Sequence, residues 1–319
     1  MSPDVSIVVV AHDSEGDLPL SLASALAQRD VAVETLVVDN ASSDRSREIV
    51  RRQASNVRLI ALPENAGFAA AINAGIEATS GRYLLSLNPD CRLAPDFAAT
   101  LTRRLDARPD VGSAAGRIYR AEGADLLPTP RLDSTGIVFT PSGRHFDRGS
   151  EEEADGRYVD EEEVAGTTAA AGFYRREALA SAKISTGYFD SDFFVYREDA
   201  DLAWRLAKLG WKCLYVPGAR AWHRRRNLPE RRRRQSSAAN FHSVKNRFLL
   251  RINNQSSGEL LRTLLPTLAR DLVVVGACLT VERSSLPAFS WLWRNRKRLR
   301  AKRREIQKLV ASRPVAPDA

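Results

Sequence analysis

The residues best suited to chemistry in this chain stand where apolar segments end. Four such segments are followed by His-Asp at 12–13, Asp-Asn at 39–40, Glu-Asn at 64–65 and Asn-Pro-Asp at 88–90. A group of carboxylates suits a hard divalent cation, which takes oxygen ligands and bridges to phosphates. Any single one of these residues could equally be an ordinary turn or helix-capping residue. Their recurrence at four successive segment ends favours a common binding site.

A phosphate-binding glycine loop is absent from this sequence. Ala11-His12-Asp13-Ser14 follows the first apolar segment, where a dinucleotide-binding protein would carry G-x-G-x-x-G. The P-loop pattern G-x-x-x-x-G-K-[ST] occurs nowhere in the chain. These absences argue against a dinucleotide dehydrogenase and a P-loop NTPase. The remaining interpretation is a protein that binds a nucleotide through side chains and a metal ion.

Alternating strands and helices in the first 120 residues must position these polar residues. Apolar segments predict strands at 5–11, 33–38, 57–62, 83–87 and 111–118, and helical spacing predicts helices at 18–26, 42–52 and 67–79. Such alternation predicts an α/β fold with a parallel sheet built from right-handed crossover units. Ligands bind beyond the carboxyl ends of the strands in such sheets, so the polar residues should share one rim.

The rest of the chain divides into a polar middle and a basic tail. Residues 120–165 are rich in Gly, Asp and Glu. A strand of small residues is predicted at 164–174, helices at 175–182 and 198–209, and a last strand at 213–216 that Pro217 and Gly218 should stop. Beyond about residue 225 the pattern is helical, amphipathic and basic, which places a boundary near 225–235.

Charge and composition narrow the class of protein. The 319 residues are 44% hydrophobic and 27% charged, which is typical of a globular protein. The net charge is +9, and basic runs at 224–226, 231–234 and 294–304 indicate an anionic partner: nucleic acid, a phospholipid surface or a phosphorylated substrate. The three separated cysteines fit neither a disulfide framework nor a zinc site. No secretion signal or spanning segment is visible, so we expect a cytoplasmic protein.

Several motifs together resemble inverting family 2 glycosyltransferases of GT-A fold. They are Val-Ser-Ile-Val-Val-Val at 5–10, Val-Val-Asp-Asn-Ala-Ser-Ser-Asp at 37–44, Pro-Glu-Asn-Ala-Gly-Phe-Ala at 63–69, Asn-x-Gly at 73–75, Leu-Asn-Pro-Asp at 87–90, Arg-Glu-Asp at 197–199 and Val-Pro-Gly-Ala-Arg-Ala-Trp-His at 216–223. The tail, with Lys-Asn-Arg at 245–247 and a basic helix around 294–308, is similar to bacterial rhamnosyltransferases that build surface polysaccharides.

The resemblance implies a GT-A fold, with a Rossmann-like, mostly parallel central sheet flanked by helices and a C-terminal helical extension. It implies a catalytic domain over 1–225, whose nucleotide-binding half covers about 1–120 and whose acceptor half covers about 121–225. A basic amphipathic helical region would follow over 226–319.

The resemblance also implies which residues bind the nucleotide. Asp39 would hydrogen-bond the base, and Ala11 and His12 would line the same pocket. Further residues of this site would be Gly67 and Asn73, near a helix N-terminus that suits a phosphate or ribose, and Asn88. Asn88 replaces the first acid of the family's D-x-D motif, which leaves fewer charged ligands for a metal.

The catalytic and metal-binding roles also come from the resemblance. Asp90 and His223 would hold Mg²⁺ or Mn²⁺, and the imidazole slightly favours Mn²⁺. Asp199 would act as the base that deprotonates the acceptor hydroxyl, with Glu198 on the acceptor side. A helix N-terminus makes a carboxylate less basic, and burial beside Glu198 would restore its basicity. Without the resemblance, ordinary first-turn acids of a helix would be the preferred interpretation.

The sequence thus predicts a metal-dependent inverting glycosyltransferase of cell-surface polysaccharide synthesis. The expected donor is dTDP-rhamnose or a UDP-sugar, and the expected acceptor is a hydroxyl of a glycan or polyprenyl-linked substrate. Trp291, Trp293 and the basic residues around them indicate that the protein binds peripherally to the anionic inner face of the cell membrane. The alternative is a helical pair packed on the catalytic domain. Arg224 and the basic residues that follow it could close over the diphosphate as a lid or remain a solvated run.

Two hypotheses from other classes stay open. The net charge of +9 prompts a nucleic-acid-binding protein, although no nucleic-acid motif appears and we expect no nucleic-acid partner. A catalytically inactive transferase fold that serves as a scaffold is the other, and intact Asp90, Asp199 and His223 argue against it.

Overall fold

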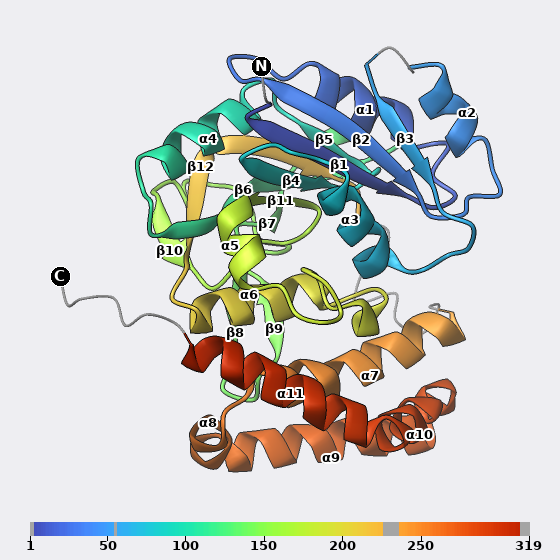
Figure 1. Cartoon of the computed structure of the whole chain (residues 1–319), viewed down its shortest axis with the longest axis vertical. Helices are drawn as coiled ribbons and strands as arrows, with labels where there is room; N and C mark the ends of the chain where they lie inside the picture. Colours follow the sequence, from blue (N-terminus) through green and yellow to red (C-terminus); the bar gives the residue numbers. More distant parts are fainter. Residues whose placement is uncertain (1–2, 54–55, 226–235, 313–319) are drawn as a thin grey trace.

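A computed structural model describes residues 3–53, 56–225 and 236–312, and a ten-stranded mixed sheet forms its centre (Figure 1). The strands β1 (Val5–Ala11), β2 (Val33–Asp39), β3 (Arg58–Ala61) and β4 (Tyr83–Leu87) run parallel in the order β3-β2-β1-β4. Between them come the helices α1 (Leu18–Leu26), α2 (Ser46–Arg51) and α3 (Phe68–Glu77). This confirms the predicted parallel half of the sheet.

The second half of the sheet is mixed in direction. Antiparallel β11 (Ala171–Arg175) lies between β4 and β6 (Val111–Glu122), and β12 (Lys212–His223) runs parallel to β6. Three short pairings complete it: β10 (Glu162–Val164) and β5 (Cys91–Leu93) with β12, and β7 (Leu127–Ser134) with β6. A separate hairpin joins β8 (Ile137–Phe139) to β9 (His145–Asp147).

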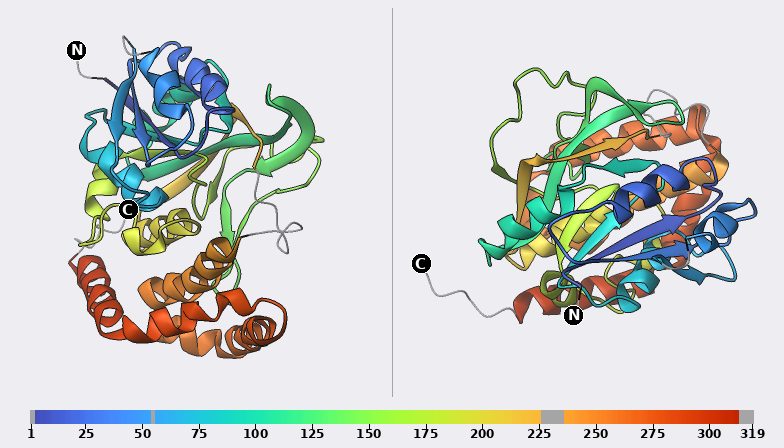
Figure 2. Two further views of the ribbon diagram at one scale, coloured as in Figure 1. Left: turned by 90° about the vertical axis from the view of Figure 1, so that its right-hand side faces the viewer. Right: turned by 90° about the horizontal axis from the view of Figure 1, so that it is seen from above.

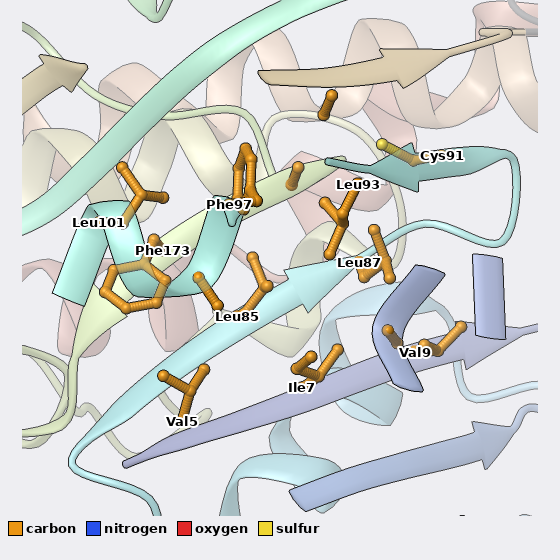
Figure 3. Packing of buried hydrophobic residues seen from close by; sticks show 14 of the residues in the cluster. Val5, Ile7, Val9, Leu85, Leu87, Cys91, Leu93, Phe97, Leu101 and Phe173 are labelled. Atoms are coloured by element: carbon orange, nitrogen blue, oxygen red, sulfur yellow. The ribbon is translucent and has the colours of Figure 1, made fainter. Parts of the chain in front are cut away.

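Helices cover both faces of this sheet because its central strands are apolar on both sides. On one face, α1 and α4 (Phe97–Asp106) bury Leu22, Phe97 and Leu101 against strand residues such as Ile7 and Leu85 (Figure 3). The opposite face is covered by α3, α5 (Arg176–Ser181) and α6 (Glu198–Lys208). The layered, mostly parallel arrangement is that of the predicted GT-A fold.

Two predicted strands have different bounds in the structure. The segment 164–174 is split between β10 and β11, with a turn between them. The last strand was expected to stop at Pro217 and Gly218, and this is wrong, because β12 continues to His223. A shift in register between Val216 and Arg220 absorbs the two residues as an irregularity, after which pairing with β6 resumes. This continuation carries His223 to the rim of the sheet.

The C-terminal region forms a layer of helices below the sheet (Figure 2). It consists of α7 (Ser237–Asn254), α8 (Ser257–Arg262), α9 (Leu264–Thr280), η3 (Arg283–Ser285), α10 (Pro287–Arg294) and α11 (Arg296–Ala311). Leu249 and Leu250 of α7 and Leu299 of α11 share one apolar cluster with Ile137, Phe193 and Ala200. The predicted helical extension is therefore packed on the sheet-containing part.

Membrane-spanning helices were sought in the described residues. None of these helices is by itself long and apolar enough to cross a membrane. Leu264–Thr280 and Arg283–Arg294 meet the length and composition criteria only as a pair, which is bent by 111°.

Candidate active site

The ends of β1, β2 and β3 are joined by hydrogen bonds between polar side chains. His12 Nδ1 lies 2.9 Å from the carbonyl oxygen of Asn40, and its Nε2 lies 3.0 Å from Nδ2 of Asn65. The Asn40 amide donates to Asn65 Oδ1 over 2.9 Å. The structure thus brings these three predicted rim residues together.

Asp39 ends β2 inside this rim and is 1% exposed. One carboxylate oxygen accepts from Nε of Arg47 and from the amide of Ser42. The other, Oδ1, is buried and has no hydrogen-bond partner in the part of the chain that the structure describes. A buried acceptor without a donor is costly, so this oxygen is suited to a donor from a bound ligand. Ala11, beside it on β1, is fully buried.

Gly67 and Asn73 bring the start of α3 against the segment that precedes α6. Gly67 has φ 82°, and a Cβ there would lie 2.5 Å from the Phe194 ring, so only glycine fits. The side-chain amide of Asn73 donates to the carbonyl oxygen of Phe189 over 2.7 Å and accepts from the Phe189 amide over 2.9 Å. Asn73 therefore holds this segment in the structure, and its nucleotide-binding role stays a prediction.

Asp90 and His223 meet at the carboxyl ends of β4 and β12. Asp90 Oδ1 lies 3.2 Å from Nε2 of His223, whose Nδ1 lies 2.7 Å from Asp133 Oδ2. Asp133 is 1% exposed and also pairs with Arg120 and Arg225. Asn88 is half-buried two residues before Asp90, and its main chain bonds Ala170 and Ser21.

This pair fits a divalent cation whose remaining ligands come from elsewhere. Two ligands at right angles around an octahedral ion, each about 2.1 Å away, lie about 3 Å apart, close to the observed 3.2 Å. A carboxylate on the far nitrogen of a metal-binding histidine is the usual second partner, and Asp133 occupies that place. Among the described residues, no group of three or more His, Cys, Asp or Glu side chains could hold a metal ion.

The two carboxylates control the charge of His223. Burial alone would lower its pKa, but Asp90 and Asp133 outweigh burial and raise the pKa to about 10. Burial likewise opposes ionisation of Asp133, yet His223 and the two arginines lower the pKa of Asp133 to about 2. The pair is therefore an ion pair without a metal, and a cation would compete with the proton on Nε2.

Asp199 lies in the first turn of α6, with Glu198 before it. Its carboxylate accepts from the amides of Ala169, over 3.2 Å, and Ala200, over 2.7 Å. Burial and then the charge of Asp147 raise the pKa of Asp199, while the hydrogen bonds from these two backbone amides oppose the rise. Burial also raises the pKa of Glu198 well above its usual range, with Asp199 adding to it. A more basic Asp199 is what proton abstraction requires.

Ion pairs and a nearby charge connect Asp90 and His223 with the surroundings of Asp199. Arg225 pairs with Asp133 on one side and with Asp147 on the other, and the charge of Asp147 acts on Asp199. The sequence analysis missed Asp133 and Asp147, which lie in the polar segment 120–165. Their only sequence signal is an acid at a strand end, which many surface turns share.

The basic residues after His223 are described only in part. Arg224 pairs with Asp17, and Arg225 pairs with Asp133 and Asp147. Neither arginine is therefore part of a run that is simply exposed to solvent. Arg226 and the run 231–234, which the lid hypothesis also includes, lie outside the described residues.

Known proteins resemble this chain in sequence and in fold. The chain is 39% identical over 140 residues to the succinoglycan biosynthesis protein ExoO of Rhizobium meliloti, an alignment that covers 41% of this chain and 40% of that protein. It is 26% identical over 243 residues to the N-acetylglucosaminyl-diphospho-decaprenol L-rhamnosyltransferase of Mycobacterium tuberculosis, covering 70% of this chain and 76% of that one. The chain therefore spans less than half of the first relative.

Among solved structures, GalNAc-T7 with UDP, GalNAc and Mn²⁺ has a TM-score of 0.61 at 14% identity, over 79% of this chain and 48% of that one. This likeness shows the fold. The family model for "Glycosyl transferase family 2" matches residues 6–183, which is more than half of the chain. The chain belongs to glycosyltransferase family 2.

Proposed function

We propose that this glycosyltransferase moves a sugar, with inversion, from a nucleotide diphosphate donor to a hydroxyl of a glycan or polyprenyl-linked acceptor in cell-surface polysaccharide synthesis. The contact chain Asp90–His223–Asp133 carries the proposal, since its spacing suits a divalent cation beside the rim expected to bind the donor. The names of the two relatives favour polysaccharide synthesis, and the second favours rhamnose as the sugar.

On the donor side, Asp39 would accept a hydrogen bond from the base through its unpaired Oδ1. Ala11 and His12 would line the base pocket, and Gly67 and Asn88 would face the ribose and diphosphate.

Asp90 and His223 would hold Mg²⁺ or Mn²⁺. When bound, such an ion neutralises the negative charge that develops on the leaving diphosphate. Asp133, bound to Nδ1, would keep Nε2 of His223 directed at the site.

On the acceptor side, Asp199 would take the proton of the acceptor hydroxyl while the oxygen of that hydroxyl attacks the anomeric carbon of the donor sugar. The hydrogen bonds from two backbone amides hold the Asp199 carboxylate in one orientation. Glu198 would contact the acceptor. General base catalysis of this kind contributes about 10²–10⁴-fold to rate.

A donor panel tests this proposal. Thermal stabilisation is measured with dTDP-rhamnose, UDP-N-acetylglucosamine, UDP-glucose and GDP-mannose, each with Mn²⁺ or with EDTA. We expect one donor to stabilise the protein with Mn²⁺ and EDTA to cancel the effect. Stabilisation by dTDP-rhamnose over the UDP-sugars supports rhamnosyl transfer, whereas the absence of stabilisation by every donor would contradict the proposal.

Asp199→Asn tests the base. With the preferred donor and N-acetylglucosaminyl-diphospho-decaprenol as acceptor probe, we expect transfer to fall by about 10²–10⁴-fold while donor affinity changes by less than about twofold. Glu177→Gln, which removes an exposed first-turn acid from α5, is the matched control and should leave transfer unchanged. Equal losses of donor binding and transfer would make Asp199 a donor-binding or structural residue.

We further propose that α8 and α9 rest on an anionic membrane. Their exposed leucines recur at helical spacing, and each is half or more exposed: Leu261, Leu265, Leu268, Leu272 and Leu279. Exposed arginines and lysines of the same layer suit anionic headgroups, and Trp293, itself exposed, suits the interface. Such a surface would bring the active site to a polyprenyl-linked acceptor.

Vesicle flotation tests this surface. The protein should float with vesicles of phosphatidylglycerol and phosphatidylcholine, less at high salt, and the double variant Leu265→Glu, Leu272→Glu should remain in solution. Leu127→Glu changes an exposed leucine of β7 and is the control. Equal flotation of all three proteins would contradict the proposal.

A further inference from the structure

The segment that leads into Asp199 has an unusual backbone. Phe194, Tyr196 and Arg197 have φ values of 66°, 70° and 73°, in the left-handed region that residues with a Cβ seldom adopt. Three such residues within four positions store conformational strain, which persists only where the surrounding structure holds the backbone in place. Arg197 is also the N-cap residue of α6, two positions before Asp199.

Asn246 of α7 holds this backbone. Its side-chain nitrogen Nδ2 lies 2.8 Å from each of the carbonyl oxygens of Phe193, Val195 and Tyr196. The residue is fully buried. Because three carbonyl oxygens converge on one atom, that atom must be the NH₂ donor, with one N–H shared between two acceptors. Lys245 adds a hydrogen bond from Nζ to the carbonyl oxygen of Asp192 over 2.5 Å.

The opposite side of the same segment contacts the donor side of the site. The carbonyl oxygen of Phe194 accepts from the amide of Ala69 at the start of α3, over 3.2 Å. The Phe194 ring occupies the space that a Cβ of Gly67 would need, and it stacks on His242 of α7 with ring centroids 4.7 Å apart. The strained segment is therefore held between α3 and α7.

Charged side chains of α11 anchor the start of the segment. Lys302 is buried and pairs with Asp190 and Asp192, and Arg298 pairs with Asp192. The side-chain amide of Asn253 on α7 also donates a hydrogen bond to the carboxylate of Asp190, over 2.9 Å. These contacts hold the segment at its beginning, whereas Asn246 binds Tyr196 and the residues on either side of Phe194.

We propose that Asn246 is a positioning residue for the base Asp199. By binding the carbonyl oxygens of residues 193, 195 and 196, it keeps the backbone at 194, 196 and 197 left-handed. It thereby sets where α6 starts and where the Asp199 carboxylate lies. This inference rests on the proposed role of Asp199 as the base. A residue of the C-terminal helices, far from the rim in sequence, thus contributes to the chemical step.

The first experiment separates positioning from folding. Asn246→Ala should lower kcat by about tenfold to a hundredfold while donor affinity changes by less than about twofold, because small displacements of a reacting group are costly in rate. Asn254→Ala is the matched control: it removes a buried amide of the same helix, bound to Asp201 and to its own helix. It should lose thermal stability with kcat nearly unchanged. Equal losses of kcat in both variants would overturn the proposal.

The pH dependence of kcat gives a second readout. The titratable and charged groups around Asp199 are Glu198, Asp147, Tyr174 and Arg225, and burial keeps the pKa of Asp199 raised. If Asn246→Ala lets the carboxylate move toward water, the acid limb of the kcat profile should move to lower pH. A limb that does not move, with kcat reduced, would indicate a structural role.

A double-mutant cycle tests the strain itself. Glycine adopts positive φ without cost, so Tyr196→Gly should reduce the dependence on Asn246. We expect Asn246→Ala to lower kcat several-fold less in the Tyr196→Gly background than in the wild type. The same loss in both backgrounds would overturn the proposal. Asn246→Ser, which keeps one hydroxyl donor, serves if the alanine variant does not fold.

Hydrogen exchange separates failure of this inference from failure of the proposed function. Peptides that cover 190–200 should exchange faster in Asn246→Ala, and not in Asn254→Ala, whether or not a donor has been found. If the wild type transfers no sugar from any donor, the proposed function fails while this measurement still tests the contact. Faster exchange with unchanged kcat in an active enzyme would refute the positioning role alone.

Discussion

Asp133→Asn is the substitution that best tests the metal site, because Asp133 touches His223 and no substrate role is proposed for it. The side chain lies 2.7 Å from His223 Nδ1 and also pairs with Arg120 and Arg225. Asparagine keeps the shape of the side chain and can keep one hydrogen bond to the imidazole, but it removes the negative charge.

The expected loss follows from two opposing effects. Removing the carboxylate behind a metal-binding histidine typically costs about 10–100-fold in metal affinity, or about 1.4–2.8 kcal/mol. The same change lowers the pKa of His223, since one of its two carboxylates is lost, and this makes the neutral ligand form easier to reach. We therefore expect the lower end of the range, about tenfold.

The loss of folding stability should be modest. Arg120 keeps its ion pair with Glu151, and Arg225 keeps its ion pair with Asp147, so neither arginine is left buried without a partner.

The assay is a Mn²⁺ titration of transfer activity at saturating donor, with calorimetric Mn²⁺ binding in the presence of the nucleotide. Glu151→Gln is the control, because it removes a carboxylate from the same Arg120 without touching His223. We expect the half-saturating Mn²⁺ concentration to rise in Asp133→Asn and to stay constant in the control. If both variants keep the wild-type Mn²⁺ dependence, Asp133 is only an ion-pair partner in the fold and the reasoning fails.

Two further predictions concern the donor and acceptor sides. Asp39→Asn should raise the donor KM by about tenfold or more with kcat little changed, since hydrogen bonds to charged groups contribute about 1.5–3 kcal/mol; calorimetry with the free nucleotide checks this. Burial raises the pKa of Glu198, so this group favours folding below its unfolded-state pKa, and that contribution is lost as pH rises through the folded-state pKa. Glu198→Gln should therefore raise the melting temperature by a few degrees near pH 8 and leave it unchanged near pH 4, and equal effects at both pH values would contradict the assignment.

The parallel half of the fold could be predicted from sequence because its signal is local. Residues 5–11 and 83–87 form β1 and β4 with the predicted bounds, since strands buried on both faces are continuous apolar runs. The carboxyl ends of parallel strands meet at one edge, so the polar residues after them could be placed together before any contact was known. The bonds among His12, Asn40 and Asn65 agree with that expectation.

The rest of the site depends on contacts between distant residues. Asp133 lies 90 residues before His223, and no periodicity relates them. Proline and glycine usually end a strand, so the continuation of β12 through Pro217 and Gly218 could not be read locally. It depends on the neighbouring β6 and β5, whose pairing beyond the irregularity stabilises Ala221 and His223 in the strand.

The C-terminal helices that follow the change of composition near residue 225 pack against the segment that leads into Asp199. Phe193 and Ala200, which flank the segment leading into Asp199, are buried against Leu249, Leu250 and Leu299 of the C-terminal helices. Without those helices, Asp190 would lose Lys302 and Asn253, and the strained segment before α6 would lose its three hydrogen bonds from Asn246. A strained backbone without its partners relaxes. The proposed base Asp199 would therefore depend for its position on a part of the chain that composition alone would assign to another role.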